Sequence, residues 1–104
     1  MYKPGDVILA SVHFTDTFEI KKRPAVILFE EFDNFVVAGI TSNINMNGIK
    51  LLKKEGVIKD SIIKLNYIFT ISKLMIEKTL FHLNSSKKQE IFKELNKKLS
   101  ALNN

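Results

Sequence analysis

The hydrophobic pattern of this 104-residue chain changes about three-quarters of the way along. Before that point, short apolar runs alternate with polar or glycine-containing turns, a pattern that is typical of β-strands. After it, apolar residues recur at helical spacing over a single segment. The sequence therefore predicts several short strands and one terminal helix, an α+β arrangement that suits a small, partly closed β-barrel.

Five segments are expected to be strands because they are short, apolar and bounded by turn residues. They are Asp6–Val12, Ala25–Phe29, Phe35–Ile40, Ile49–Leu52 and Ser61–Ile71. A polar loop separates the first two, and Pro24 favours an extended conformation for the preceding Arg23. No repeat or linker interrupts the pattern, so residues 1–104 are expected to form a single domain.

The terminal helix is expected to run from Ser86 to about Leu102, with Ser86 and Gln89 forming a capping box. Its apolar stripe consists of Ile91, Phe92, Leu95, Leu99 and Leu102. A helix of this size is about 25 Å long, enough to pack across one side of a small barrel. One or two further helical turns are expected within Ser72–Lys78.

The composition excludes several classes of protein. Cysteine is absent and there are only two histidines, so disulfides, thiolate zinc sites, iron–sulfur clusters and histidine-rich metal sites are ruled out. The sequence thus predicts neither a metal nor a cofactor. No apolar run approaches the roughly 20 residues of a membrane span, and the first residues do not resemble a signal peptide. We expect a cytoplasmic protein that does not bind membranes.

The net charge is +5, and 15 of the 16 basic residues are lysine. Arg23 is the only arginine, which makes it a candidate for a role that lysine cannot fill. The planar guanidinium group can bind a phosphate or carboxylate through two parallel hydrogen bonds. The alternative is an ordinary surface arginine near the mouth of the barrel, and the residues alone leave both interpretations open.

Several motifs, in this order along the chain, resemble those of the MazF/PemK family of bacterial and archaeal toxins. They are Gly5–Leu9 leading to Phe14–Asp16, Lys22–Leu28, Ile40–Ser42, Gly56–Ser61 and Phe69–Ile71. The resemblance extends over nearly the whole chain. It implies an SH3-like barrel with a C-terminal helix, usually assembled as a homodimer.

The resemblance also implies a function. Family members typically cleave single-stranded RNA, often mRNA, at short sequences without a metal, leaving 2′,3′-cyclic phosphate and 5′-OH ends. Many are paired with an antitoxin whose acidic, flexible tail would suit this basic chain, and their complexes bind DNA. The alternative is a non-catalytic binding module on the same barrel. Such a module would be a gyrase inhibitor or a degenerate toxin that only binds RNA or antitoxin.

The resemblance assigns catalytic roles to three residues. Arg23 matches the arginine before proline that holds the phosphate and assists the leaving group. Thr41 matches a strand-end threonine whose hydroxyl binds the scissile phosphate, although a Thr-Ser-Asn sequence can also simply cap the backbone where a strand ends. Glu19 is the candidate general base, with a solvated loop carboxylate as the alternative.

Six further residues are expected to bind RNA: Ser42, Lys21, Lys22, Lys64, Asn66 and Tyr67. Lys64 and Asn66 are expected to share a face of the longest predicted strand, since residues two apart point to the same side, and they match an arginine and an aspartate in some relatives. Asparagine cannot accept a proton as aspartate does, which weakens that version of the mechanism. Tyr67 could stack on a base or belong to the core, and the lysines could simply be solvated.

Overall fold

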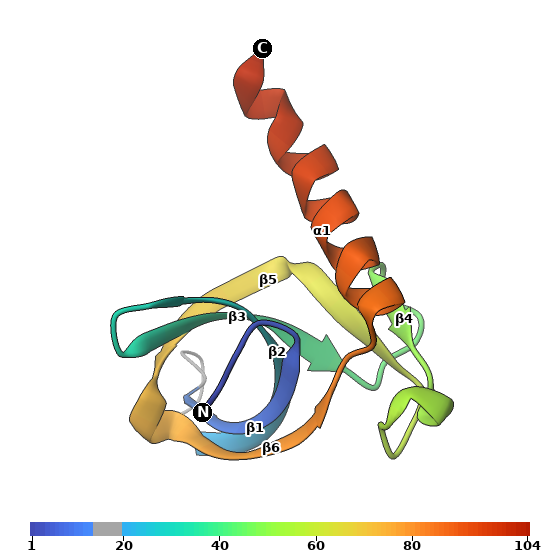
Figure 1. Ribbon diagram of the computed structural model, residues 1–104. Coiled ribbons are helices and arrows are strands. Elements are labelled where there is room, and N and C mark those ends of the chain that lie inside the picture. Colours follow the sequence, from blue (N-terminus) through green and yellow to red (C-terminus); the bar gives the residue numbers. More distant parts are fainter. Residues whose placement is uncertain (14–19) are drawn as a thin grey trace.

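The computed structural model describes residues 1–13 and 20–104 (Figure 1). In these residues, six strands form one antiparallel sheet in the order β4-β5-β3-β2-β1-β6. Their bounds are Asp6–His13 (β1), Ile20–Glu31 (β2), Asn34–Thr41 (β3), Ile49–Leu51 (β4), Ser61–Ser72 (β5) and Ile76–His82 (β6). The sheet curls into a partly closed barrel from which a single helix, Ser85–Leu99 (α1), projects. The expected mainly β fold with a C-terminal helix is confirmed.

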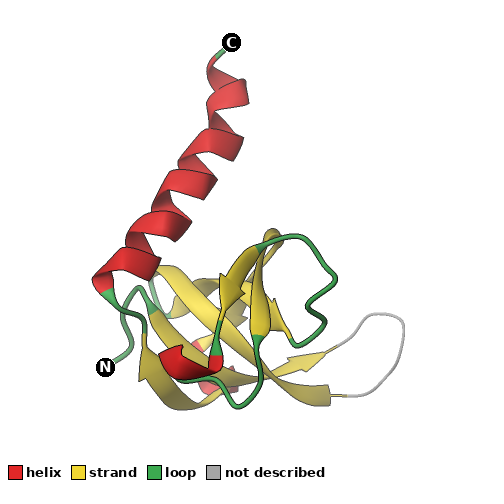
Figure 2. Cartoon of the chain, turned by 90° about the vertical axis from the view of Figure 1, so that its right-hand side faces the viewer, coloured by secondary structure: helices red, strands yellow, loops and turns green. Residues whose placement is uncertain are grey.

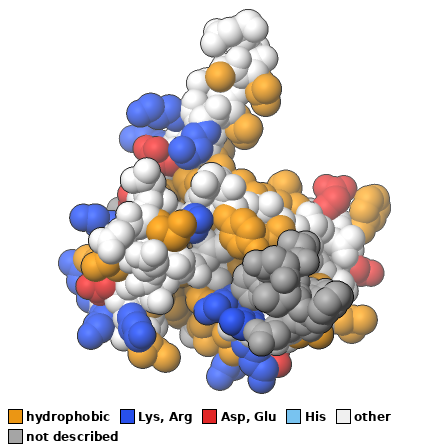
Figure 3. Space-filling view, turned by 180° about the vertical axis from the view of Figure 1, so that it is seen from behind, with side chains coloured by type: hydrophobic (Ala, Val, Ile, Leu, Met, Phe, Trp, Pro, Cys, Tyr) orange, Lys and Arg blue, Asp and Glu red, His pale blue; other side chains and the backbone are white. Residues whose placement is uncertain are grey.

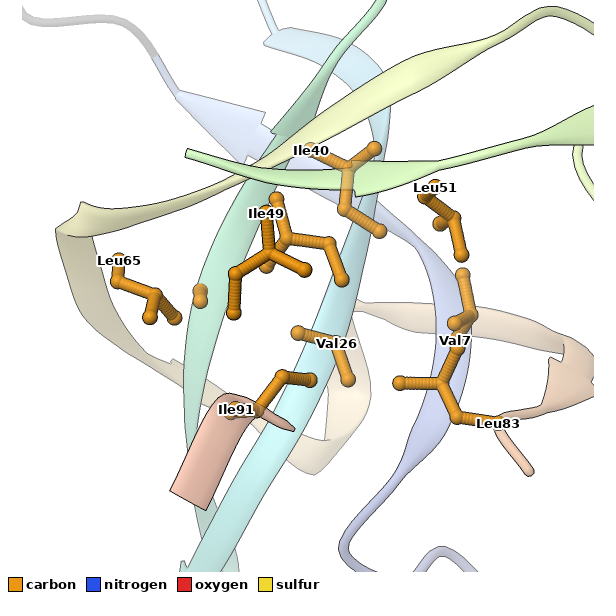
Figure 4. Packing of buried hydrophobic residues seen from close by; sticks show 10 residues of the cluster. Val7, Val26, Ile40, Ile49, Leu51, Leu65, Leu83 and Ile91 are labelled. Carbon is orange, nitrogen blue, oxygen red and sulfur yellow. The ribbon is translucent and has the colours of Figure 1, made fainter. Parts of the chain in front are cut away.

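The sheet buries apolar side chains on both of its faces. Neighbouring residues belong to different clusters: Val7 and Val26 pack in one, whereas Ile8 and Ile27 pack in the other. Figure 4 shows the first cluster, in which Ile91 of α1 lies against the sheet. Burial on both faces explains why the strand segments are continuous apolar runs instead of alternating apolar and polar residues.

Of the one or two helical turns expected within Ser72–Lys78, the structure contains a single 3-10 turn, and the remaining residues belong to strands. A short 3-10 turn spans Lys73–Met75, where the Ser72 hydroxyl accepts a hydrogen bond from the backbone N–H of Leu74 at 3.2 Å. The chain then continues directly as β6. This strand lies at the edge of the sheet beside β1, and most of its side chains are exposed. Because an edge strand has little to bury, it carries no clear strand pattern in the sequence.

The terminal helix begins one residue earlier than expected, and its N-cap is Asn84. The Asn84 side chain accepts a hydrogen bond from the backbone N–H of Lys87 at 2.8 Å, as an N-cap residue should. The predicted capping box of Ser86 and Gln89 is therefore wrong. The helix ends at Leu99 and continues as a 3-10 turn over Ser100–Asn103. Another 3-10 turn spans Lys53–Glu55.

The helix does not pack along the side of the barrel for its whole length, although it is long enough to do so. Ile91 is buried and Leu95 is half-buried, whereas Phe92, Leu99 and Leu102 are exposed. Figure 2 shows α1 leaving the barrel at its first turns, and Figure 3 shows hydrophobic side chains along its projecting part. An apolar stripe indicates which face of a helix can be buried, but not whether the domain provides a surface to cover it.

The start of the helix is fixed by Lys87. Its ammonium group donates to the backbone carbonyl of Lys50 at 2.6 Å and forms ion pairs with Glu55 and Glu90 at 3.6 and 3.2 Å. The Lys87 side chain is only 13% exposed. These contacts join the first turn of α1 to β4 and to the turn that follows it, which holds the helix at an angle to the barrel.

Candidate functional site

The candidate site lies where strands β2 and β3 separate. Ala25 of β2 pairs with Gly39 of β3. The described pairing between β2 and β3 stops at this pair, while Arg23 still pairs with β1 and Thr41 still pairs with β5. A cavity of about 360 Å³ lies where β2 and β3 diverge. The side chains near the point of separation therefore line this cavity.

Pro24 stands at the point of separation. A proline has no backbone N–H and is tolerated in a sheet only where no ladder hydrogen bond is needed on that side. Pro24 pairs with Leu9 of β1, and the described pairing between β2 and β3 begins one residue later. The Arg-Pro sequence thus places an extended arginine beside the opening of the sheet.

Five of the residues singled out from the sequence meet at this cavity: Arg23, Thr41, Ser42, Lys64 and Tyr67. They come from three strands and from the turn that follows β3. Among the described residues that line the cavity, the charged side chains are Arg23 and Lys64, and both are cationic. This arrangement favours an anionic ligand.

Thr41 is oriented by a local hydrogen bond. Its hydroxyl oxygen accepts a hydrogen bond from the backbone N–H of Asn43 at 3.1 Å. The threonine therefore does cap the backbone where β3 ends, which was the alternative to a catalytic role. A hydroxyl that accepts one hydrogen bond still has its own proton to donate. The cap therefore fixes the position of the Thr41 oxygen and leaves a donor available at the cavity.

An aromatic wall completes the site. The rings of Tyr67 and Phe69 lie 5.1 Å apart between centroids, tilted by 43°, and both residues line the cavity. The ammonium group of Lys64 is 5.9 Å from the centroid of the Tyr67 ring, within the range of a cation–π interaction. The cavity therefore combines cations and a hydroxyl with a flat apolar surface.

The other sequence-predicted residues lie elsewhere. Lys22 alternates to the opposite face of β2 from Arg23 and forms an ion pair with Glu77 of β6 at 3.2 Å. Lys21 is exposed on β2 and is not among the residues lining the cavity. Glu19, the expected general base, lies outside the described residues.

Asn66 lines a second cavity, of about 770 Å³, between the start of β4, β5 and α1. Lys64 and Met46 line both cavities, so the two adjoin. Met46, which lies in the turn between β3 and β4, was not among the residues expected from the sequence. The available signal was the polar, glycine-containing stretch around it, since such loops often carry binding residues.

Within residues 1–13 and 20–104, no three histidine, aspartate or glutamate side chains are grouped so that they could hold a metal ion. In the same residues, no helix is both long and apolar enough to cross a membrane.

A family model described as "PemK-like, MazF-like toxin of type II toxin-antitoxin system" matches residues 3–99. The chain belongs to this toxin family. The family expected from the sequence motifs is thereby confirmed, and the protein is a toxin of a type II toxin–antitoxin system. No curated protein matches the sequence.

Solved structures of MazF-type toxins share the fold. The Mycobacterium tuberculosis toxin MazF-mt6 matches with a TM-score of 0.71 at 20% identity, covering 88% of this chain and 93% of that one. An endoribonuclease in complex with its cognate antitoxin, from a mycobacterial species, matches with a TM-score of 0.74 at 12% identity, covering 95% and 93%. A MazE-MazF structure from Deinococcus radiodurans gives 0.71 at 16% identity, covering 94% of each chain.

Proposed function

We propose that this toxin is a metal-independent endoribonuclease that cleaves single-stranded RNA, with mRNA as its target, at a short sequence. The observation that carries the proposal is that Arg23, Thr41 and Lys64, whose side chains carry a guanidinium, a hydroxyl and an ammonium group, line one cavity. All three groups donate hydrogen bonds to anionic oxygen, which is what the transition state of phosphodiester cleavage requires.

The proposed reaction is an internal transfer at phosphorus. The ribose 2′-oxygen loses its proton to a base and forms a bond to the adjacent phosphorus, while the bond from phosphorus to the 5′-oxygen breaks. The leaving 5′-oxygen takes a proton, and the products are a 2′,3′-cyclic phosphate and a 5′-OH. Negative charge builds on the phosphoryl oxygens during the step, so preorganised donors stabilise the transition state more than the substrate.

Each residue has a role that follows from its chemistry. The fork of Arg23 holds two phosphoryl oxygens, and Arg23 also hydrogen-bonds the leaving oxygen. Thr41, whose oxygen is fixed by the N–H of Asn43, donates a hydrogen bond from its hydroxyl to the phosphate, and Ser42 assists beside it. Lys64 supplies a point charge for the phosphate of the neighbouring nucleotide. Glu19 is proposed as the base on its resemblance to a loop glutamate of some relatives.

The same charges suit the proposed partners. An antitoxin with an acidic, flexible tail would be attracted to a toxin of net charge +5 and would cover the cation-lined cavity. We also propose that the toxin acts as a homodimer. RNA binding through Arg23, Lys64 and the exposed Lys21 would weaken as salt rises, because each phosphate contact releases bound counterions.

The test is a cleavage assay in EDTA on a mixed-sequence single-stranded RNA, with the product ends mapped. We expect the wild type to leave 2′,3′-cyclic phosphate ends and Arg23→Ala to lose this activity. The matched control is Lys54→Ala, which removes one positive charge from an exposed residue outside both cavities and should leave cleavage unchanged.

Cleavage that depends on an added divalent metal, or that survives in Arg23→Ala, would contradict the proposal. If neither protein cleaves any of several RNAs while both remain folded, the non-catalytic binding module becomes the better explanation. Binding of RNA or of the antitoxin would then be measured directly.

A further inference from the structure

The pairing between β5 and β3 is interrupted at the candidate site. Ala38 of β3 pairs with Ile68 of β5, and the next residue, Gly39, pairs with Lys64. The three residues between these partners on β5, positions 65–67, have no partner of their own in this ladder and form a three-residue bulge. Bulges of this kind turn a side chain away from the regular alternation and are common beside active sites. Tyr67 is the last residue of the bulge.

The bulge places the Tyr67 ring directly against the backbone of Gly39. A Cβ atom built on Gly39 would lie 2.6 Å from Cδ2 of Tyr67 and 3.1 Å from Cε2. Gly39 does not have the positive φ found at Gly5, Gly48 and Gly56, so its conformation does not call for glycine. The absence of a side chain at Gly39 is instead what allows the tyrosine ring to approach so closely.

The Tyr67 ring packs against its neighbours but remains partly exposed to solvent. Tyr67 is 44% exposed and lines the cavity together with Arg23. Phe69 contacts it at a centroid distance of 5.1 Å, and the Lys64 ammonium lies 5.9 Å from its centroid. An aromatic residue that served only the core would be buried, as Phe35 is at 2% exposure.

We propose that Tyr67, supported by Gly39, is a stacking platform for one unpaired base of the RNA, next to the phosphate that is cleaved. This inference rests on the proposed function and adds a subsite to it, with an unpaired nucleobase as the ligand. Lys64, beside the ring, contacts the phosphate of the same nucleotide. Stacking accepts every base, so the platform positions the strand and strengthens binding without reading its sequence. Gly39 is a positioning residue that acts through Tyr67.

The platform is tested by removing bases and the ring in combination. A 2′-O-methylated RNA oligonucleotide cannot be cleaved, because the attacking hydroxyl is blocked. A single abasic nucleotide is moved along it, and binding is measured by fluorescence anisotropy. For the wild type, we expect at least one position at which loss of the base weakens binding by about tenfold and does so through Tyr67. At that position, loss of the base should have little effect on RNA binding by the Tyr67→Leu variant.

Two matched variants separate stacking from folding. Tyr67→Phe keeps the ring and should retain the full effect of the abasic position. Phe32→Leu removes an aromatic side chain that is 88% exposed at the β2–β3 turn, outside the cavity, and should also behave like the wild type. Each variant is first checked for a cooperative unfolding transition like that of the wild type.

Gly39→Ala tests the support beneath the ring. The new methyl group would displace the Tyr67 ring, so we expect the abasic effect to shrink several-fold in this variant. In the double variant Gly39→Ala/Tyr67→Leu, the alanine should cause no further loss of binding, because the ring it displaces is already gone. A full additional loss would show that Gly39 acts independently of Tyr67.

The outcomes distinguish the platform from the nuclease. An equal abasic effect in the wild type and in Tyr67→Leu, or no binding of RNA by the wild type, overturns the platform. If that happens while Arg23-dependent cleavage is observed, the proposed nuclease function still holds. The reverse result, a Tyr67-dependent abasic effect without cleavage of natural RNA, supports the platform and overturns the nuclease.

Discussion

The two halves of strand β2 differ in their neighbours. Ala25 and Val26 pair with both β1 and β3, Ile27 pairs with β3, and all three residues are buried. Residues 20–24 pair with β1, lie outside the described pairing with β3 and are mostly exposed. The buried residues 25–27, here called the closed half, contribute stability. The mostly exposed residues 20–24, the open half, contribute the arginine of the site. One strand thus serves both purposes because the sheet opens partway along it.

The largest expected effect is on stability, in the closed half. Ile27 is 1% exposed in the second core cluster. Replacing it by alanine deletes buried methyl groups and leaves a cavity, so Ile27→Ala should lower the free energy of unfolding by about 2–5 kcal/mol. Urea denaturation at a fixed protein concentration measures this. A change below about 1 kcal/mol would show that the two halves of β2 do not differ as described.

The next effect is on activity, in the open half. Arg23→Ala should slow RNA cleavage by about 100- to 1000-fold, because one donor to the developing charge is lost. Its free energy of unfolding should change by less than about 1 kcal/mol, as for most exposed side chains. Initial rates and urea denaturation are measured on the same samples. An activity loss that merely follows unfolding would erase the distinction between the two halves.

The contact between paired strands β1 and β6 extends the comparison to another part of the sheet. Asp6 is 5% exposed, and its carboxylate lies 2.8 Å from Nδ1 of His82 and accepts from the backbone N–H of Lys3 at 3.0 Å. Asp6→Ala leaves these donors without a partner and should lower the free energy of unfolding by about 1–3 kcal/mol. The control is Lys88→Ala, which removes the exposed contact to Nε2 of His82 and should have a smaller effect in the same denaturation experiment.

The smallest effect is expected on the projecting part of the helix. Phe92 is 71% exposed, whereas its neighbour Ile91 is 6% exposed. Phe92→Ser should therefore change the free energy of unfolding by less than about 0.5 kcal/mol, and Ile91→Ala by considerably more. Thermal or urea unfolding checks both. A strong effect of Phe92→Ser that depends on protein concentration would instead show that a second copy covers this face.

Some of the fold follows from local chemistry. The apolar runs around Val7 and Val26 predict strands correctly because their residues are buried on both faces of the sheet. The edge strand β6 was missed because its side chains are largely exposed and leave no pattern. The direction of α1 was missed because it depends on contacts made by Lys87 to residues far away in the sequence.

The site shows the same division at the level of single residues. Strand alternation separates Lys22 from Arg23, yet the partner of Lys22 is Glu77, which only the tertiary structure brings within 3.2 Å. The bulge in β5 likewise has no sequence signal of its own. It turns Tyr67 onto Gly39, a contact between residues that are far apart in the chain.

The sequence by itself determined the fold class, the family and the identity of the residues that carry charge and hydroxyl groups. These depend on residue type and on spacing over a few positions, which are local properties. Only the tertiary structure decided that Arg23, Thr41 and Lys64 line one cavity and that Tyr67 lies on Gly39. The physical reason is that these contacts depend on where β2 and β3 separate and where β5 bulges, and both follow from the packing of the whole sheet.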